Sequence, residues 1–159
     1  MGLLIAIASY YLIHEGTHLV YALLIGAFKQ VNFGALGMQI DVFAEQMTDQ
    51  QMGIFCLLGS LLTLLAGWSL SIAAETISKH PSKLFKSCMY YVTLALLLID
   101  PLYLSVLCGF FGGGDMNGIA LLIPELAARV IYSALLVING CIILRRVYPV
   151  YRAAFQNQA

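Results

Sequence analysis

Charged residues are scarce in this chain, making up 10% of its 159 residues. Soluble domains carry about a quarter charged residues, so the composition excludes an ordinary water-soluble domain. Eight basic and eight acidic side chains cancel to a net charge of zero, and this balance gives no indication of nucleic-acid binding. We therefore expect a protein whose surroundings are the lipid bilayer, with no nucleic-acid partner.

Cysteine is also sparse, and no Cys-x-x-Cys pair occurs. The four cysteines lie far apart in or beside apolar runs: Cys56, Cys88, Cys108 and Cys141. This spacing is typical of free thiols packed as small apolar residues. A disulfide framework is therefore not expected.

Apolar residues supply what the charges do not, at 61% of the chain and a mean hydropathy of +0.89. The first run lacks the basic segment and the cleavage site of a signal peptide, so we read it as a retained span. The fold class we predict is an all-α polytopic membrane protein, a single domain over residues 1–159 with about four transmembrane helices. The predicted spans are residues 2–28, 49–76, 84–111 and 119–144, followed by a basic tail over 145–159.

Two connecting segments differ from ordinary loops. In residues 29–43, Val31 and Phe33 alternate with polar residues, which predicts a short β-hairpin; a membrane-surface loop is the alternative. An edge strand there could pair with an extended substrate. Residues 109–118 contain five glycines, which favours an unwound stretch before the fourth span. Pro124 suits a first helical turn, so the alternative is a regular helix that begins there.

Basic residues gather in two places, the Lys79–Lys86 loop and the arginines of the tail. With four spans, both regions fall on the same side of the membrane. The positive-inside rule makes that side cytoplasmic, which predicts cytoplasmic N- and C-termini. The hairpin and the glycine-rich turn would then share the opposite side.

The first predicted span contains His14-Glu15-Gly16-Thr17-His18. Residues four apart lie on one face of a helix, so both imidazoles could bind one metal ion. Glu15 lies beside that face, where its carboxylate could take a proton from a metal-bound water. Ionisable groups are costly inside a bilayer, so their presence in this segment indicates a functional site.

A catalytic zinc usually has three protein ligands, and the motif supplies two. The acidic candidates for the third are Asp41 in the hairpin, Asp100 beside Pro101, Asp115 and Glu125. Asp115 is favoured because its glycine neighbours let the backbone bring a short carboxylate to the metal. Asp100 stays open as the alternative ligand, and Glu125 is expected to pair with Arg129 four residues later.

Taken in order, these features resemble the site-2 protease family of intramembrane zinc metalloproteases. His14-Glu15-Gly16-Thr17-His18 matches the zinc helix of the family, and Gly59-Ser60-Leu61-Leu62-Thr63 lies where members often carry Gly-Pro-x-x-Asn. Asp115 lies where members carry Leu-Asp-Gly, although Met116 follows it here. The chain is thus similar to minimal, divergent bacterial members.

The resemblance implies one zinc ion held by His14, His18 and Asp115, with Glu15 as general base. It implies hydrolysis of a peptide bond in a membrane protein or membrane-anchored peptide, in the bacterial cytoplasmic membrane. The candidate substrate contacts are Asn117, Thr63, Val31 and Phe33. The alternatives are a metal-binding membrane protein without proteolysis, such as a transporter or sensor, and an inactive protease-like scaffold.

Overall fold

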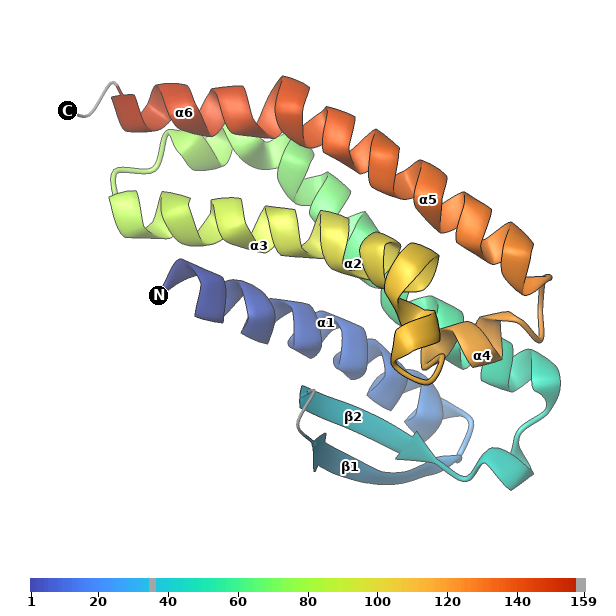
Figure 1. Ribbon diagram of the computed structural model, residues 1–159. Coiled ribbons are helices and arrows are strands. Elements are labelled where there is room, and N and C mark those ends of the chain that lie inside the picture. The colour runs from blue at the N-terminus through green and yellow to red at the C-terminus, as the bar shows by residue number, and fades with distance from the viewer. Residues whose placement is uncertain (35–36, 157–159) are drawn as a thin grey trace.

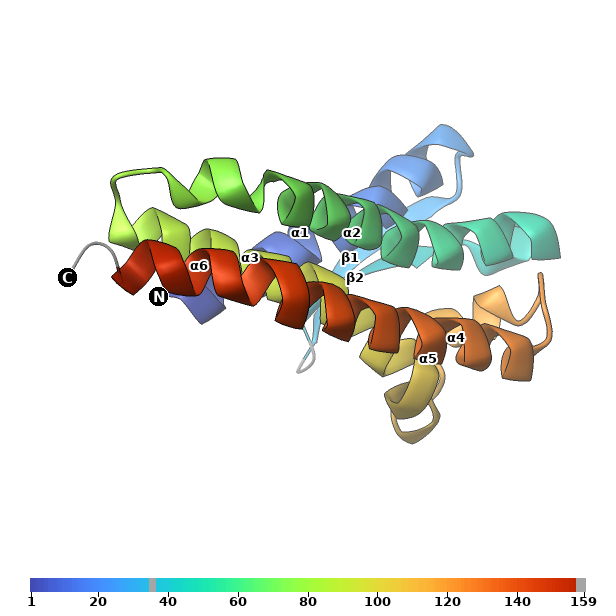
Figure 2. The same ribbon diagram turned by 90° about the horizontal axis from the view of Figure 1, so that it is seen from above.

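The computed structural model describes residues 1–34 and 37–156, and most of them are helical (Figure 1). The helices and strands in chain order are α1 (Gly2–Leu24), β1 (Phe28–Gly34), β2 (Gly37–Val42), α2 (Asp49–Ser78), α3 (Lys83–Leu102), α4 (Asp115–Ile119), α5 (Glu125–Ile142) and α6 (Tyr148–Gln156). A π-helical turn (Ile143–Val147) joins α5 to α6, so the two form one long rod (Figure 2).

Within the described part of the chain, four helical stretches are long and apolar enough to cross a membrane. They are Gly2–Leu24, Asp49–Ser78, Lys83–Phe110 and Glu125–Gln156. Large apolar side chains point outward from them; Leu12 and Leu24 are 71% and 79% exposed. Such surfaces suit contact with lipid, which is consistent with a multi-pass membrane protein. The predicted helical fold with a small hairpin is thereby confirmed.

Helix starts follow from local sequence signals. Thr48 and Gln51 form a reciprocal capping box at the start of α2, and the Ser82 hydroxyl accepts the Phe85 N–H at the start of α3. Pro124 precedes α5, and Glu125 pairs with Arg129 across one turn at 2.7 Å, as expected.

The hairpin is confirmed, and its position is more informative than its existence. β1 and β2 are antiparallel, with Val31 opposite Ile40 and Gly34 opposite Gly37. The expected turn falls on residues 35–36, outside the described residues. The strands run back alongside α1 (Figure 1), with β2 between α1 and β1. Gly37 packs so closely that a Cβ there would lie 2.4 Å from the Tyr11 ring.

The third span passes through Pro101 without a break. A proline in a helix removes one backbone donor and crowds the preceding turn. Here a π-helical turn (Tyr103–Leu107) and a 3-10 turn (Cys108–Phe110) follow it, and the Ser105 hydroxyl donates to the Pro101 carbonyl at 2.5 Å. This irregular end of the span leads to the segment that carries Asp115.

Several predicted boundaries require correction. The first span ends at Leu24 rather than at residue 28, because Gly26 turns the chain with a φ of +72°. The glycine-rich stretch is shorter than predicted. Positive φ angles are confined there to Gly112, Gly113 and Gly114, and α4 begins directly at Asp115.

The fourth span also differs at both ends. It begins at Glu125 rather than at residue 119, in agreement with the alternative start at Pro124. The helix also does not end at residue 144, since α6 continues it through most of the predicted basic tail, to Gln156. Val147 and Tyr151 are almost fully buried against Ala74 of α2, so apolar packing holds this basic segment in helical form.

Both views place the N-terminus, the connection between α2 and α3, and the end of α6 at one end of the bundle (Figures 1 and 2). The base of the hairpin, the glycine turn and α4 lie towards the other end. The two basic regions of the sequence therefore lie at the same end, as four spans require.

Candidate metal centre

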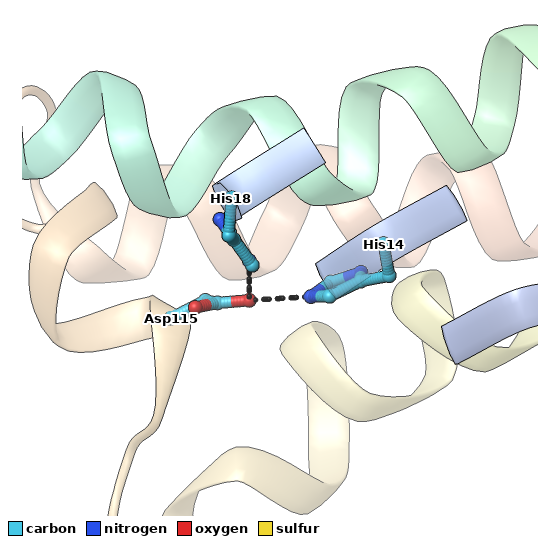
Figure 3. Close-up of side chains that lie close together, drawn as sticks. All are labelled: His14, His18 and Asp115. Carbon is cyan, nitrogen blue, oxygen red and sulfur yellow. Dashed lines mark hydrogen bonds and ion pairs between the residues drawn. The ribbon is translucent and has the colours of Figure 1, made fainter. Parts of the chain in front are cut away.

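Three side chains from two distant parts of the sequence converge beside the middle of α1 (Figure 3). His14 and His18 point from one face of α1 towards Asp115, the first residue of α4. Asp115 Oδ2 lies 2.9 Å from His14 Nε2 and 3.5 Å from His18 Nε2. Both histidines are buried, so this polar cluster lies inside the protein.

The donor set fits a metal ion. One ligand atom from each of the three side chains lies within 4.8 Å of the others. Ligands about 2.0–2.2 Å from a tetrahedral zinc lie roughly 3.4 Å apart. The distances from Asp115 Oδ2 to the two Nε2 atoms, 2.9 and 3.5 Å, are close to this value. The group could hold a metal ion with no large movement, although this geometry does not by itself identify the metal.

The surroundings of His18 also fit a metal ligand. The ring is 3% exposed, and neither of its nitrogens has a hydrogen-bond partner among the described residues. Leaving a buried polar group unpaired costs about 1–3 kcal/mol. The ring is stacked on Phe55 with centroids 4.4 Å apart, so it cannot turn to water without losing this contact. A metal at Nε2 would satisfy one of the two orphaned nitrogens.

Gly59 of α2 makes room for the two imidazoles. A Cβ at this position would lie 2.7 Å from His18 Nε2 and 2.9 Å from His14 Nε2. Real Cβ atoms do not approach so closely, so only glycine leaves the ligand atoms uncovered. Gly67 lies two turns further along α2, where it lets the helix pack closely against Leu97, whereas Gly59 makes room for the metal site.

Glu15 lies next to the cluster and faces the hairpin. Its Oε2 accepts a hydrogen bond from the backbone N–H of Ile40 at 3.0 Å, and the side chain is 8% exposed. In an antiparallel pair, backbone groups point alternately towards and away from the partner strand. The Ile40 N–H points away from β1, so the outer edge of β2 faces Glu15.

Behind His14 lies a second carboxylate, that of Asp100 on α3. Asp100 is 1% exposed, and its Oδ1 lies 3.2 Å from His14 Nδ1. Tyr10 donates its hydroxyl proton to the same oxygen at 2.5 Å, and the Thr63 hydroxyl contacts the other oxygen. Asp100 therefore lies on the opposite side of the imidazole from Asp115.

The structure separates the remaining acidic candidates from the cluster. Asp41 accepts hydrogen bonds from Asn32 and Gln30 on the hairpin, at 2.7 and 3.2 Å. Glu125 pairs with Arg129 at the start of α5. Of the four acidic residues considered, only Asp115 lies with both histidines.

The candidate substrate contacts are dispersed. Thr63 is fully buried against Asp100, whereas Asn117 is exposed and donates to the Gly112 carbonyl across the glycine turn. Val31 and Phe33 lie on β1, the strand farther from α1 (Figure 1). A substrate contact by any of the four stays a prediction.

Sequence reasoning missed three contributors: Tyr10, Gly59 and the Ile40 amide. Tyr10 precedes His14 by four residues, so helical spacing alone could have placed it on the ligand face. Gly59 and the Ile40 amide have no such signal, because each acts through a tertiary approach between distant segments.

The cluster thus consists of two buried imidazoles, one carboxylate that could complete a metal site, and a neighbouring glutamate. The donors suit a first-row divalent metal such as zinc. Comparison of the chain with protein-family models, with curated proteins and with solved structures finds no match.

Proposed function

We propose that this protein is an intramembrane zinc metalloprotease, which hydrolyses a peptide bond in or near a transmembrane segment of a membrane-anchored substrate. One observation carries the proposal: the carboxylate of Glu15 lies between a potential His-His-Asp metal site and the outer edge of β2. A metal transporter or sensor needs the metal site, but it has no evident use for the neighbouring glutamate or for the strand edge. The resemblance to the site-2 protease family points to the same activity.

Zinc bound by His14, His18 and Asp115 would supply Lewis-acid activation of water and of the scissile carbonyl. Glu15 would take the proton of the attacking water and then pass it to the leaving amine. Asp115 retains 21% side-chain exposure, unlike the two histidines. The glycine turn before it is our candidate for the route by which water reaches the site.

The substrate would bind in extended form. A transmembrane helix hides its backbone in its own hydrogen bonds, so cleavage requires local unwinding. Pairing with a sheet edge would hold the unwound segment. The sequence suggested that the substrate pairs with β1, at Val31 and Phe33. Because β2 is the strand beside α1, we propose instead that the substrate pairs with the outer edge of β2 around Ile40.

The membrane orientation is also proposed. The connection between α2 and α3 and the helix α6, which belong to the two basic regions, lie at the end of the bundle that holds the N-terminus. By the positive-inside rule that end faces the cytoplasm, and the base of the hairpin lies on the opposite side of the membrane. The bacterial cytoplasmic membrane is the location implied by the resemblance.

The test compares wild-type protein with Glu15→Gln in detergent micelles and in proteoliposomes. Zinc content is measured by elemental analysis, and cleavage is measured on a fluorescent single-span reporter peptide. Glu45→Gln is the matched control, since Glu45 is exposed in the turn after the hairpin. We expect zinc in all three proteins and cleavage by wild type and Glu45→Gln.

Glu15→Gln should retain the metal and lose cleavage by at least 100-fold, within the range for removal of a general base. Equal cleavage by Glu15→Gln would overturn the mechanism. Zinc binding without cleavage of the reporter by wild type would favour the transporter or sensor instead. A wild-type protein that binds no metal would exclude both functions.

A further inference from the structure

Asp100 is a buried acidic residue within one of the four apolar helical stretches. It lies in the middle of a membrane-spanning helix, 1% exposed, and it is not one of the three converging ligands. A buried carboxylate is costly unless its oxygens receive hydrogen bonds. Such a residue in a span indicates a role, and its contacts show which one.

Its contacts come from two other helices. Tyr10 of α1 donates to Oδ1 at 2.5 Å, and the Thr63 hydroxyl of α2 lies against Oδ2. His14 presents Nδ1 to the same region, 3.2 Å from Asp100 Oδ1 and 3.3 Å from the Tyr10 hydroxyl oxygen. The Tyr10 hydroxyl uses its proton in the hydrogen bond to Asp100. The Tyr10 hydroxyl oxygen and Asp100 Oδ1 can therefore both accept a hydrogen bond from the Nδ1–H of His14.

The two nitrogens of an imidazole point in opposite directions, and the partner of one sets the state of the other. A proton held at His14 Nδ1 leaves the Nε2 lone pair for a metal. Nε2 is the nitrogen that faces Asp115. Asp100 cannot share a metal with Nε2, because it lies on the Nδ1 side of the ring.

We propose that Asp100 is a positioning residue for the metal site: held in place by Tyr10 and Thr63, it accepts a hydrogen bond from the Nδ1–H of His14 and thereby aims Nε2 of that ring at the metal. The inference rests on the metal site of the proposed function and not on peptide hydrolysis. It also gives Thr63 a role different from the expected substrate contact.

The experiment measures metal binding directly, without cleavage. Zinc affinity is determined by competition with a chromophoric chelator in detergent micelles, for wild type, Asp100→Leu, Asp100→Asn and Thr63→Val. Thr93→Val is the control, because Thr93 is an equally buried threonine on α3 whose hydroxyl bonds to Met89 of its own helix. The visible spectrum of each Co²⁺-loaded protein reports the ligand geometry.

Loss of an outer partner of a histidine ligand typically weakens metal binding about 10–100-fold. We expect that loss for Asp100→Leu, together with a changed Co²⁺ spectrum. Asp100→Asn keeps an acceptor for His14 and should lose less, and Thr63→Val should weaken binding by a few fold. Thr93→Val should match wild type in affinity and spectrum.

Wild-type affinity and an unchanged Co²⁺ spectrum in Asp100→Asn and Thr63→Val would overturn the inference, even if Asp100→Leu does not fold. So would an equal loss in Thr93→Val, which would indicate a general packing effect. If wild type binds no zinc at all, the metal site and the proposed function fail together. If wild type binds zinc and the Asp100 variants bind it equally well, this inference alone fails.

Discussion

The backbone N–H of Ile40 donates a hydrogen bond to Glu15 Oε2 at 3.0 Å, although the two residues are 25 positions apart. The contact joins the outer edge of β2 to the glutamate that flanks the metal cluster. A strand edge inside a membrane protein needs partners for its backbone groups, and Glu15 supplies one. In the proposed reaction, the same edge would hold the substrate within reach of Glu15.

Replacing Ile40 with proline tests this relationship. Proline removes the N–H that Glu15 accepts, and it is tolerated on strands whose N–H points away from the sheet. We expect zinc content to stay at the wild-type level and reporter cleavage to fall at least 10-fold, because Glu15 loses its backbone partner on the strand edge that would hold the substrate. Elemental analysis and the proteoliposome cleavage assay provide the two measurements.

Ile40→Ala is the matched control, since it keeps the amide and removes most of a side chain that is 5% exposed. Its cost should be mainly to stability, about 2–5 kcal/mol for truncation of a buried aliphatic side chain. If Ile40→Ala loses as much cleavage as Ile40→Pro at equal folded fraction, the amide is not the important group.

The hairpin shows how far sequence patterns reach. Alternation in residues 29–43 is a local signal, and it predicted the two strands correctly. The position of the hairpin along α1 depends on two tertiary contacts, Ile40 with Glu15 and Gly37 with Tyr11. No local pattern encodes such pairings, so a surface hairpin and one that lies beside the site looked alike.

The metal site likewise combines features that local sequence signals predict with features that depend on tertiary contacts. The four-residue spacing of His14 and His18 placed both on one helix face, and glycines marked the segment that brings Asp115 to them. The sequence gives no metal-site role to Gly59, because it cannot show that the neighbours of this glycine are imidazoles. No helix is predicted for the basic tail, because its arginines are more conspicuous than the apolar spacing of Val147 and Tyr151, which are buried.

Gly59→Ala should damage the metal site by steric overlap alone. The added methyl group would lie 2.7 Å from His18 Nε2 and 2.9 Å from His14 Nε2. We expect a loss of zinc and a destabilisation of about 1–3 kcal/mol, as for other overpacked interiors. Zinc content and thermal unfolding in detergent would measure both effects.

Gly16→Ala is the control for this variant, and it lies inside the motif itself. A Cβ at Gly16 meets nothing within 4 Å, and the residue is in the interior of α1. Alanine favours a helix over glycine by up to about 1 kcal/mol, so stability should rise or stay level with zinc unchanged. Loss of zinc in Gly16→Ala comparable to that in Gly59→Ala would refute the steric explanation.

Asp115→Ala should remove zinc almost completely, because it deletes the one carboxylate that faces both Nε2 atoms. Asp41→Ala should leave zinc content unchanged, since Asp41 bonds to Asn32 and Gln30 on the hairpin. Asp100→Ala should fall between them, weakened rather than emptied. A greater loss in Asp100→Ala than in Asp115→Ala would make Asp100 the third ligand and contradict the assignment.

Metal removal should destabilise wild type far more than His18→Leu. Without metal, wild type keeps two buried ring nitrogens of His18 that have no hydrogen-bond partner in the described part of the chain, at a cost of about 1–3 kcal/mol each. Leucine fits the apolar contact with Phe55 and has no polar atom to satisfy. We therefore expect metal-free His18→Leu to unfold at the same temperature as metal-free wild type, or at a higher one.

Zinc at 1,000 times its dissociation constant should stabilise wild type by about 4 kcal/mol, and the variant by far less. Differential scanning fluorimetry in detergent, with and without zinc, would measure all four states. Equal stabilisation of both proteins by zinc would place the ion elsewhere, because the orphaned nitrogens of His18 would then not be its ligands.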